Sequence, residues 1–389
     1  MEWIDAYLDE RKKQHLLRTL KPLRPAGPGR VYINDVEYLN FSSNDYLGLA
    51  GHPRLREESQ KALNEYGTSS SASRLMSGDL SIHHQLEEMI ADFMGKEKAI
   101  LFGSGYLANI GLISALCDRN DVIFSDRLNH ASIVDGVLLS GTRCFRFRHN
   151  DVDHLETLMK RERKRFKKAF IIAESLFSMD GDMTPLKEIV GLKERYDALF
   201  ILDEAHAVGV IGKKGAGLAE KYGLTKKIDI IMGTFGKALG SYGAYAAASA
   251  RLIDYCINRA RSFIYSTALP PSVTGASIGG IKMLTEEPAR RSILLEKAKY
   301  FRSLLKENHL NIMGNAQIVP VLVGENYDAL NISNRLYENA IFALAMRPPT
   351  VPAGKARIRF SITCNHSEDD LKKAADVLKH AFKQIPISK

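Results

Sequence analysis

Short apolar segments alternate with helical patterns between about residue 50 and residue 250 of the chain. The candidate strands are 99–102, 122–125, 144–148, 170–173, 199–202, 228–232 and 245–248. Short apolar strands that alternate with helices are typical of a mainly parallel sheet covered by helices on both faces. The pattern therefore predicts a large α/β domain.

The pattern changes after the Pro-Pro pair at 270–271. Helices and strands no longer alternate there, and the expected elements are helices over 272–284, 290–308 and 367–384 and strands over 317–323 and 357–362. This order predicts a second, smaller domain of the α+β type.

The N-terminal residues follow neither pattern. The first 20 predict an amphipathic helix with Leu8, Leu16 and Leu17 on one face. Residues 21–30 are rich in Pro and Gly and predict a linker, and 32–41 predicts a short hairpin around an Asn-Asp pair. We expect an N-terminal helix and arm, a large domain and a small C-terminal domain, over 1–48, 49–285 and 286–389.

The composition is that of a globular protein. Of 389 residues, 45% are hydrophobic and 25% are charged, which excludes a disordered or collagen-like chain and allows a large core. Lys and Arg number 54 against 45 Asp and Glu, so the formal net charge is +9. A basic surplus suits an anionic substrate, cofactor or partner, but it does not define a fold.

The sequence offers no targeting, membrane or metal signal. The four cysteines are far apart, so we expect reduced thiols in a cytoplasmic protein and no metal site. The N-terminal segment has no apolar core of a signal peptide. The longest uncharged run, 99–117, is interrupted by Gly103, Gly105 and Asn109, and it predicts a strand, a glycine turn and a buried helix.

Polar residues follow the strand predicted over 199–202. In a parallel sheet, ligands bind beyond the carboxyl ends of the strands, and this strand ends in Asp-Glu-Ala-His. Asp203, with His206 three residues on, can hold a heteroaromatic ring by charge and hydrogen bond. An Asp after a strand also serves as a helix N-cap or a metal ligand, so this pair alone leaves the alternatives open.

A lysine lies between glycines after the next strand. Strand 228–232 is followed by Gly-Thr-Phe-Gly-Lys-Ala-Leu-Gly, in which the lysine is Lys237. Glycines let the backbone approach a ligand closely, and a desolvated lysine becomes a nucleophile of the Schiff-base kind. A phosphate contact or a surface lysine is the plainer alternative, although the segment is not a Walker A motif.

The turn Gly103-Ser104-Gly105 follows a strand and opens a helix. Backbone N–H groups and the helix dipole bind phosphate at such a place. The spacing to Ala108 also matches the loose dinucleotide fingerprint, with Asp126 near the expected distance downstream. A nicotinamide-dependent dehydrogenase is therefore a rival interpretation, although it assigns no role to the lysine.

Three more residues occupy informative positions. His130 follows a strand, where an imidazole can stack on a flat ring or handle a proton, although a lone histidine is more often structural. Ser178 can donate to a ring oxygen, and Arg359 can bind a carboxylate through its planar fork. A lysine amine, a carboxylate, a phosphate cradle, an imidazole and an arginine together suit pyridoxal 5′-phosphate and an amino acid.

Five segments of the chain match a known family: NFSSNDYLG (40–48), NHAS (129–132), FSMDG (177–181), DEAH (203–206) and TFGK (234–237). With these segments the chain resembles the α-oxoamine synthases over nearly its whole length. The resemblance implies the aspartate-aminotransferase-like α/β fold of type I pyridoxal-phosphate enzymes.

Two further stretches, IYSTALPP (264–271) and MRPPTVP (346–352), resemble the family branch that forms 8-amino-7-oxononanoate in biotin biosynthesis. The loop 67–74 differs from the family pattern, because it carries serines where related enzymes often have more glycine.

The resemblance implies a role for each candidate residue. Lys237 carries the cofactor as an aldimine and later acts as acid and base, and Asp203 pairs with the pyridinium nitrogen. The other implied cofactor contacts are His206 and Ser178 at the ring hydroxyl oxygen, His130 stacked on the ring, Gly105, Tyr106 and Thr234 at the phosphate, and Ser266 and Thr267 at the phosphate of a neighbouring subunit. Lys237, Asp203, His206 and His130 are the implied catalytic residues.

The resemblance also implies the substrate contacts and the reaction. The implied substrate contacts are Arg359 and Asn44 at the amino-acid carboxylate, together with Arg18, Thr350 and His130. The implied reaction condenses L-alanine with pimeloyl-CoA or a pimeloyl-acyl carrier protein, with loss of carbon dioxide, and makes the enzyme an acyltransferase. A cytoplasmic homodimer with shared active sites is expected, without nucleic-acid or membrane partners.

Other interpretations stay open at this stage. A sister activity, such as 2-amino-3-ketobutyrate CoA ligase, 5-aminolevulinate synthase or serine palmitoyltransferase, uses a different amino acid and thioester. The basic run 160–168 raises the question of nucleic-acid binding, but no aromatic stripe or binding motif accompanies it, and a solvated helix face is the simpler interpretation. A docking face for an acidic carrier protein or for CoA phosphates is a further hypothesis.

Overall fold

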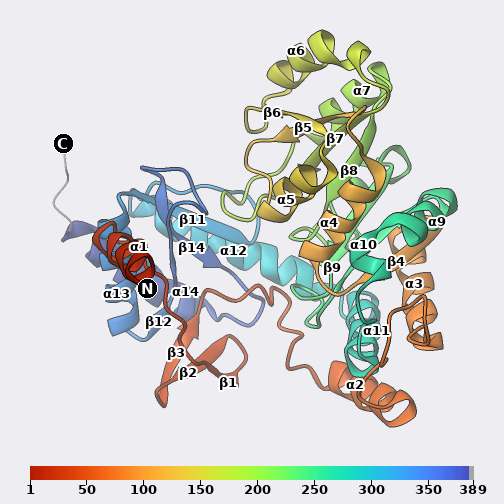
Figure 1. Cartoon of the computed structure of the whole chain (residues 1–389). Coiled ribbons are helices and arrows are strands. Elements are labelled where there is room, and N and C mark those ends of the chain that lie inside the picture. Colours follow the sequence, from red (N-terminus) through yellow and green to blue (C-terminus); the bar gives the residue numbers. More distant parts are fainter. Residues whose placement is uncertain (385–389) are drawn as a thin grey trace. The chain divides into compact units, whose positions relative to one another are not determined.

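The structure is a computed structural model that describes residues 1–384, and the chain forms two compact units (Figure 1). The large unit comprises residues 49–177 and 183–291, and the small unit comprises 1–48, 178–182 and the described residues from 292 onward. The domain limits expected from the sequence stay a prediction, and residues 385–389 of the expected small domain lie outside the described part.

A seven-stranded sheet forms the centre of the large unit. Its order is β4 (Lys98–Phe102), β10 (Ala244–Ala248), β9 (Ile230–Thr234), β8 (Leu199–Asp203), β7 (Ala169–Glu174), β5 (Val122–Asp126) and β6 (Arg143–Phe147). Strands β9, β8, β7, β5 and β6 pair in parallel, whereas β10 is antiparallel to both of its neighbours. The prediction of a mainly parallel sheet is confirmed.

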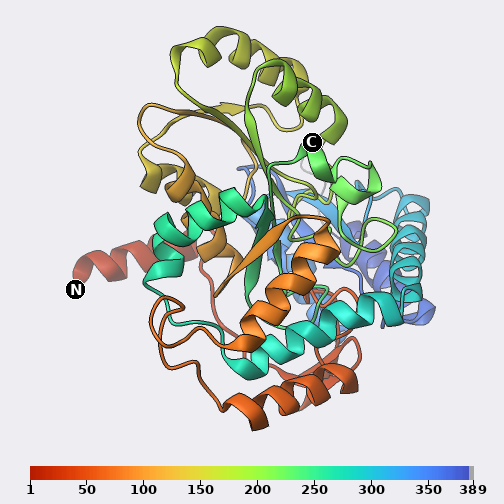
Figure 2. The ribbon, with the colours of Figure 1, turned by 90° about the vertical axis from the view of Figure 1, so that its right-hand side faces the viewer.

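The helices of the large unit are α2 (Pro53–Tyr66), α3 (Ser81–Met94), α4 (Gly105–Leu116), α5 (Ala131–Ser140), α6 (Val152–Glu162), α7 (Leu186–Arg195), α8 (Leu218–Lys221), α9 (Ala250–Arg259), α10 (Arg261–Ile264) and α11 (Pro271–Glu286). Helices α2 and α11 lie side by side (Figure 2). A Cβ at Gly275 of α11 would lie 2.4 Å from the Glu58 carbonyl oxygen of α2, so this close approach requires glycine.

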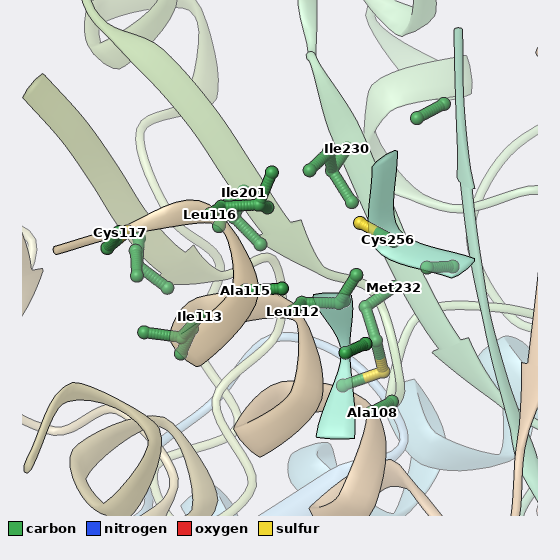
Figure 3. Close-up of a cluster of buried hydrophobic side chains, with 14 of the residues drawn as sticks. Ala108, Leu112, Ile113, Ala115, Leu116, Cys117, Ile201, Ile230, Met232 and Cys256 are labelled. Atoms are coloured by element: carbon green, nitrogen blue, oxygen red, sulfur yellow. The ribbon is translucent and has the colours of Figure 1, made fainter. Parts of the chain in front are cut away.

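Helix α4 is buried against the sheet. Its side chains Ala108 and Leu112 belong to one apolar cluster with Ile201 of β8 and Met232 of β9 (Figure 3). A helix that is apolar on nearly every side is stable only when it is buried in this way. The uncharged run 99–117 is thus β4, a turn and α4, as predicted. Among the described helices, none is long and apolar enough to cross a membrane.

The small unit contains two sheets and four helices among the described residues. One sheet has the order β1 (Arg24–Gly27), β2 (Arg30–Ile33), β3 (Val36–Asn40) and β12 (Ile341–Phe342), and the other has β11 (Ile318–Gly324), β14 (Ala356–Ser361) and β13 (Ala345–Met346). Its helices are α1 (Glu2–Lys13), α13 (Asn326–Glu338), α14 (Glu368–Lys383) and α12 (Ala289–Glu307), which starts in the large unit. A 3₁₀ turn follows α6 at Arg163–Arg165, and another precedes β9 at Thr225–Lys227.

Two expectations for the N-terminal arm are wrong, and one is confirmed. Helix α1 ends at Lys13, before Leu16 and Leu17, because His15 adopts a left-handed conformation (φ 57°). The expected linker 21–30 includes the edge strand β1, where proline is tolerated. The hairpin of β2 and β3 forms as expected around Asn34-Asp35, both with positive φ as a tight hairpin turn requires.

A buried histidine makes the stability of the small unit depend on pH. The His366 ring is fully buried, its Nδ1 accepts the Thr363 backbone N–H (3.2 Å) and its Nε2 lies 3.1 Å from the Asn40 carbonyl oxygen. It also stacks on Phe41, with 4.2 Å between ring centroids. Burial lowers the pKa of His366 to about 4.

We expect His366 to destabilise the fold progressively as the pH falls from about 6.5 to about 4. The folded pKa lies below the unfolded one, so the stabilisation is complete above pH 6.5, and up to about 3 kcal/mol is lost once the pH has passed below the folded pKa. Urea unfolding at pH 7 and pH 4.5 measures this change. His366→Gln should unfold more easily at pH 7 but show a smaller difference between the two pH values. Equal pH differences for the two proteins would contradict the prediction.

Candidate active site

Polar residues end adjacent parallel strands of the large unit. Glu174 is the last residue of β7 and pairs in register with Asp203, the last residue of β8, and Thr234 is the last residue of β9. Because these strands run in the same direction, their carboxyl ends meet at one edge of the sheet. The candidates Asp203 and Thr234 therefore lie at the same edge of the sheet.

The Asp203 carboxylate is almost fully buried, with 6% of the residue exposed. Its Oδ1 accepts the Ala205 backbone N–H (2.9 Å), and its Oδ2 accepts the Asn109 side-chain amide (3.0 Å). A buried carboxylate is stable only when such donors replace its lost hydration. Two donors from separate segments therefore fix the direction of this carboxylate.

His206 lies in a tight turn directly after Asp203 and is 6% exposed. The Glu204 carbonyl oxygen accepts the backbone N–H groups of Ala207 and Val208, both at 2.9 Å. The Glu204 carboxyl group, which is fully buried, accepts two further backbone N–H groups at the start of α8, and burial raises its pKa to about 7. Glu204 thus holds the turn that carries His206.

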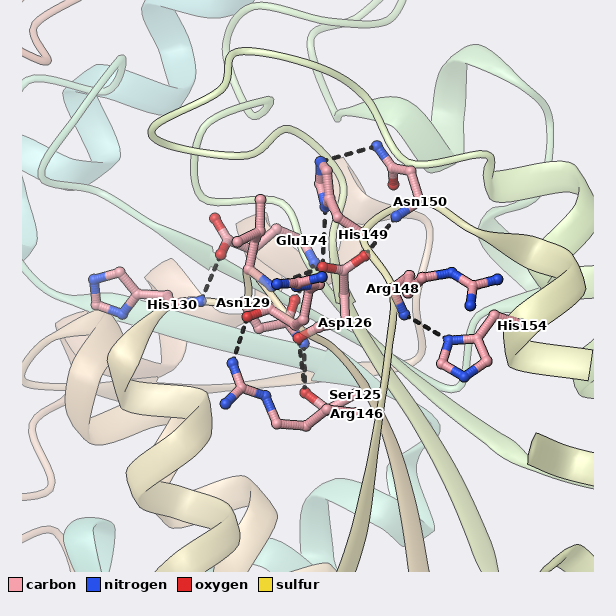
Figure 4. Close-up of polar contacts among 12 residues, drawn as sticks. Ser125, Asp126, Asn129, His130, Arg146, Arg148, His149, Asn150, His154 and Glu174 are labelled. Carbon is pink, nitrogen blue, oxygen red and sulfur yellow. Dashed lines mark hydrogen bonds and ion pairs between the residues drawn. The ribbon is translucent and has the colours of Figure 1, made fainter. Parts of the chain in front are cut away.

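His130 immediately precedes α5, and its backbone N–H donates to the Glu174 carboxylate at 2.6 Å (Figure 4). His130 is exposed, which leaves part of the residue accessible to a ligand. Burial of the rest of the ring lowers the pKa of His130, Asp203 raises it, and the Lys237 charge lowers it further. These interactions group His130, Asp203 and Lys237 in the large unit.

The N-terminus of α4 and the end of β9 form a compact cradle. Ser104 caps the helix by accepting the Leu107 N–H (3.2 Å), while the first N–H groups of a helix have no partner within it. A Cβ at Gly105 would lie 2.8 Å from Thr234 Cγ2. The Thr234 hydroxyl is buried and has no hydrogen-bond partner among residues 1–384. An anion bound at the helix N-terminus would satisfy both groups.

The remaining cofactor candidates of the large unit are less buried. Lys237 is half-buried and follows Thr234 by three residues, in the turn after β9. Tyr106 is 43% exposed, and its hydroxyl bonds to Asp135. The segment with Ser266 and Thr267 pairs with the serine-rich loop through a bridge between Ser73 and Thr267. Contact of these two residues with the phosphate of another subunit stays a prediction.

Arg359 of β14 organises the candidates of the small unit. Its residue is 4% exposed, and its Nε donates to the Ser178 carbonyl oxygen at 2.6 Å. One terminal nitrogen donates to Ser361 Oγ (2.6 Å), and the other bonds to Asn44 Oδ1 (3.2 Å) and to the Tyr46 hydroxyl (3.3 Å). The structure therefore brings Arg359, Asn44 and Ser178 together.

The last predicted pair also meets within the small unit. The Arg18 guanidinium donates to the Thr350 hydroxyl at 2.9 Å, although 332 positions separate the two residues. Arg347, in the same loop as Thr350, donates to the His15 carbonyl oxygen. The segment after α1 is thereby tied to the Arg-Pro-Pro-Thr loop.

Three buried polar residues of the site were not identified from the sequence. Asn109 of α4 donates to Asp203, Ser132 lies 2.8 Å from His130 Nδ1, and Glu174 accepts the His130 N–H. A signal existed for Asn109, because it is a polar residue inside an otherwise apolar helix. The local sequence pattern does not show, however, that Asn109 bonds to Asp203, which lies 94 positions away.

The residues of the large unit fit pyridoxal phosphate. A helix N-terminus and the unpartnered Thr234 hydroxyl suit the phosphate, a buried carboxylate suits the ring nitrogen, and an amine lies in the same turn as the cradle. The nicotinamide alternative fits less well. It needs Asp126 for a ribose, but that carboxylate is 1% exposed and accepts the backbone N–H groups of Leu128 and Asn150.

The family model of class I and II aminotransferases matches residues 36–378. The chain belongs to this family. The 8-amino-7-oxononanoate synthase of Geobacter sulfurreducens is 45% identical to it, over 98% of either chain. These matches confirm the predicted aspartate-aminotransferase-like fold and the resemblance to the α-oxoamine synthases.

Solved structures agree with this placement. A serine palmitoyltransferase from S. paucimobilis with bound PLP–myriocin aldimine superposes with a TM-score of 0.92, at 27% identity, over 98% of this chain and 97% of that one. An 8-amino-7-oxononanoate synthase from Francisella tularensis gives a TM-score of 0.78, at 29% identity, over 89% of this chain and 98% of that one. The cofactor of the family is pyridoxal phosphate, as predicted.

We expect Gly105→Ala to weaken the binding of pyridoxal phosphate about tenfold or more, a free-energy change of at least about 1.4 kcal/mol. The added methyl group would meet Thr234 Cγ2 at 2.8 Å, and a β-branched side chain has little freedom to move away. Titration of the apoprotein with the cofactor, followed by absorbance, measures the dissociation constant.

Gly191→Ala is the matched control for that substitution. Gly191 lies in the exposed surface of α7, and a Cβ there meets no atom within 4 Å. It should leave the affinity for the cofactor unchanged. Equal affinities of the wild type and Gly105→Ala would contradict the assignment of the cradle.

Proposed function

We propose that the chain catalyses the decarboxylative condensation of L-alanine with a pimeloyl thioester, which gives 8-amino-7-oxononanoate in biotin biosynthesis. The observation that carries this proposal is the 45% identity, over 98% of both chains, to a relative named 8-amino-7-oxononanoate synthase. Fold alone does not define a substrate, because one fold serves many reactions.

Bound pyridoxal phosphate supplies a carbonyl group that condenses with amines and a ring that accepts the electron pair left on the amino-acid Cα. In this proposal the Lys237 amine holds the resting cofactor and moves the proton at Cα. Asp203 keeps the ring nitrogen protonated, His130 stacks on the ring, and His206 and Ser178 contact its hydroxyl oxygen. Gly105, Tyr106 and Thr234 bind the phosphate, joined by Ser266 and Thr267 from a second subunit.

Arg359 and Asn44 bind the amino-acid carboxylate in this proposal. The planar guanidinium matches a carboxylate, and the contacts of Arg359 with Ser178 and Ser361 hold it in place. Arg18 and Thr350, which bond to each other, serve as contacts for the acyl substrate. The acyl group is carried by CoA or by an acyl carrier protein, and the enzyme acts as a homodimer.

A sister activity is the second candidate. The serine palmitoyltransferase structure superposes more closely, with a TM-score of 0.92 against 0.78. Its sequence identity, however, is only 27%, and the relative from G. sulfurreducens shares 45%. Since side chains rather than the backbone select the amino acid and the acyl group, the higher identity favours alanine and pimeloyl.

We expect Lys237→Ala to lack the visible absorbance band that a lysine-bound cofactor gives, because the variant has no amine at that position. Absorbance of the purified protein, reconstituted with pyridoxal phosphate, tests this. Lys213→Ala removes an exposed lysine of the same unit and should keep the band. A band of normal strength in Lys237→Ala would show that another lysine holds the cofactor.

We also expect L-alanine and pimeloyl-CoA or pimeloyl-acyl carrier protein to yield 8-amino-7-oxononanoate, detected by mass spectrometry. Alanine labelled in its carboxyl group should release the label as carbon dioxide, because the carboxylate is lost. Glycine and L-serine serve as competing amino acids, each with several acyl-CoAs. A higher kcat/KM for glycine or serine with another thioester would assign the chain to a sister activity.

A further inference from the structure

A buried hydrogen-bond network links the phosphate helix, the candidate ring carboxylate and the candidate stacking histidine. Asn109 of α4 is 1% exposed, and its Nδ2 lies 2.9 Å from Ser132 Oγ and 3.0 Å from Asp203 Oδ2. Ser132, which is fully buried, lies 2.8 Å from His130 Nδ1 through its Oγ. The network thus connects three segments of the large unit that are far apart in the sequence.

The donor and acceptor at each position follow from chemistry. An amide nitrogen only donates, and a carboxylate only accepts, so the NH₂ group of Asn109 faces Asp203. The opposite orientation of the amide would place its oxygen against the carboxylate. The second N–H of the same NH₂ group then donates to Ser132 Oγ, whose own proton is directed toward the imidazole of His130.

The tautomer of His130 follows from the same reasoning. Two groups direct a proton toward His130 Nδ1: the Ser132 hydroxyl at 2.8 Å and, more weakly, the Ser132 backbone N–H at 3.2 Å. Together they make this nitrogen an acceptor without a proton. In the neutral ring the proton is therefore on Nε2. A proton on Nδ1 would face two other protons: that of the Ser132 backbone N–H and that of the Ser132 hydroxyl, which Asn109 directs toward the ring.

We propose that Asn109 is a positioning residue that orients the Asp203 carboxylate and, through Ser132, fixes His130 as the tautomer with its proton on Nε2. This inference rests on the proposed function for the roles of Asp203 and His130 toward pyridoxal phosphate. Because Asn109 is 1% exposed, it acts through the side chains that it contacts. It couples the helix expected to bind the phosphate to the two groups expected to bind the ring.

The network is tested first in the apoprotein, without cofactor or substrate. With ¹⁵N-labelled histidine, the two-bond ¹H–¹⁵N spectrum distinguishes the two tautomers, and loss of one signal in His130→Asn assigns the residue. We expect the Nε2–H form alone in the wild type and a mixture with the Nδ1–H form in Ser132→Ala and in Asn109→Ala. An unchanged tautomer in both variants would overturn the proposal, whatever reaction the enzyme catalyses.

The second measurement is the affinity for pyridoxal phosphate. Asn109→Asp keeps the shape of the side chain but replaces a donor by an acceptor beside Asp203, so we expect a loss of tenfold or more. Asn109→Ala should also bind the cofactor more weakly. Ser132→Ala should lose less affinity, because the bond between Asn109 and Asp203 remains. Ser114→Ala is the control, because within residues 1–384 Ser114 Oγ bonds only to carbonyl groups of α4 itself.

Wild-type affinity in Asn109→Asp would overturn the proposed link to Asp203. If Asn109→Asp does not fold, Ser132→Ala still decides the link to His130 through the apoprotein spectrum, and Asn109→Ala decides the link to Asp203 through the affinity. The visible absorbance of the loaded protein against pH adds a readout that a purely structural role would not change. We expect its midpoint to move in Asn109→Ala and to stay in Ser114→Ala.

Discussion

The candidate active site depends on a buried carboxylate whose oxygens must find hydrogen-bond donors within the protein. Asp203 ends an inner strand of the sheet and is 6% exposed, and the cost of burying an unpartnered charge there is several kcal/mol. One backbone N–H and one side-chain amide offset that cost, and each belongs to a segment that also carries another candidate group of the site. Ala205 lies in the turn that carries His206, and Asn109 lies in the helix that begins at the phosphate cradle. The hydrogen bonds that stabilise the Asp203 carboxylate therefore also position the turn of His206 and the helix α4 beside it.

In the small unit, too, single buried side chains hold several groups of the candidate site in place. Ser178 to Asp182 follow β7 in the sequence but pack in the small unit. Two almost fully buried arginines of β14 account for this, because Arg357 bonds to Asp180 and to the Met179 carbonyl oxygen, while Arg359 bonds to the Ser178 carbonyl oxygen. The arginine expected to bind the substrate carboxylate thus also fixes the backbone of the serine expected at the cofactor ring.

Much of the fold was predictable from the sequence, because short apolar strands separated by helices have few alternatives to a parallel sheet. Errors arose where local composition was misleading: Leu16 and Leu17 extend an apolar pattern beyond the helix that ends at Lys13, and prolines near residue 25 hide an edge strand. The candidate site was recognisable from the sequence as a set of residue types at predicted strand ends. Its supporting contacts were not, since the bond from Asn109 to Asp203 joins residues 94 positions apart and has no local period.

Some of the excess positive charge makes contacts within the protein and is not directed toward a partner. In the run 160–168, Arg163 donates to carbonyl groups of Phe166, Tyr196 and Asp197, and Lys168 pairs with Asp121 and the Leu116 carbonyl oxygen. Charges held in this way support the ends of helices and strands and are poorly placed for an external partner. Exposed ion pairs contribute little, whereas a buried, oriented guanidinium binds a carboxylate with high selectivity. The net charge of +9 therefore does not by itself indicate an external anionic partner.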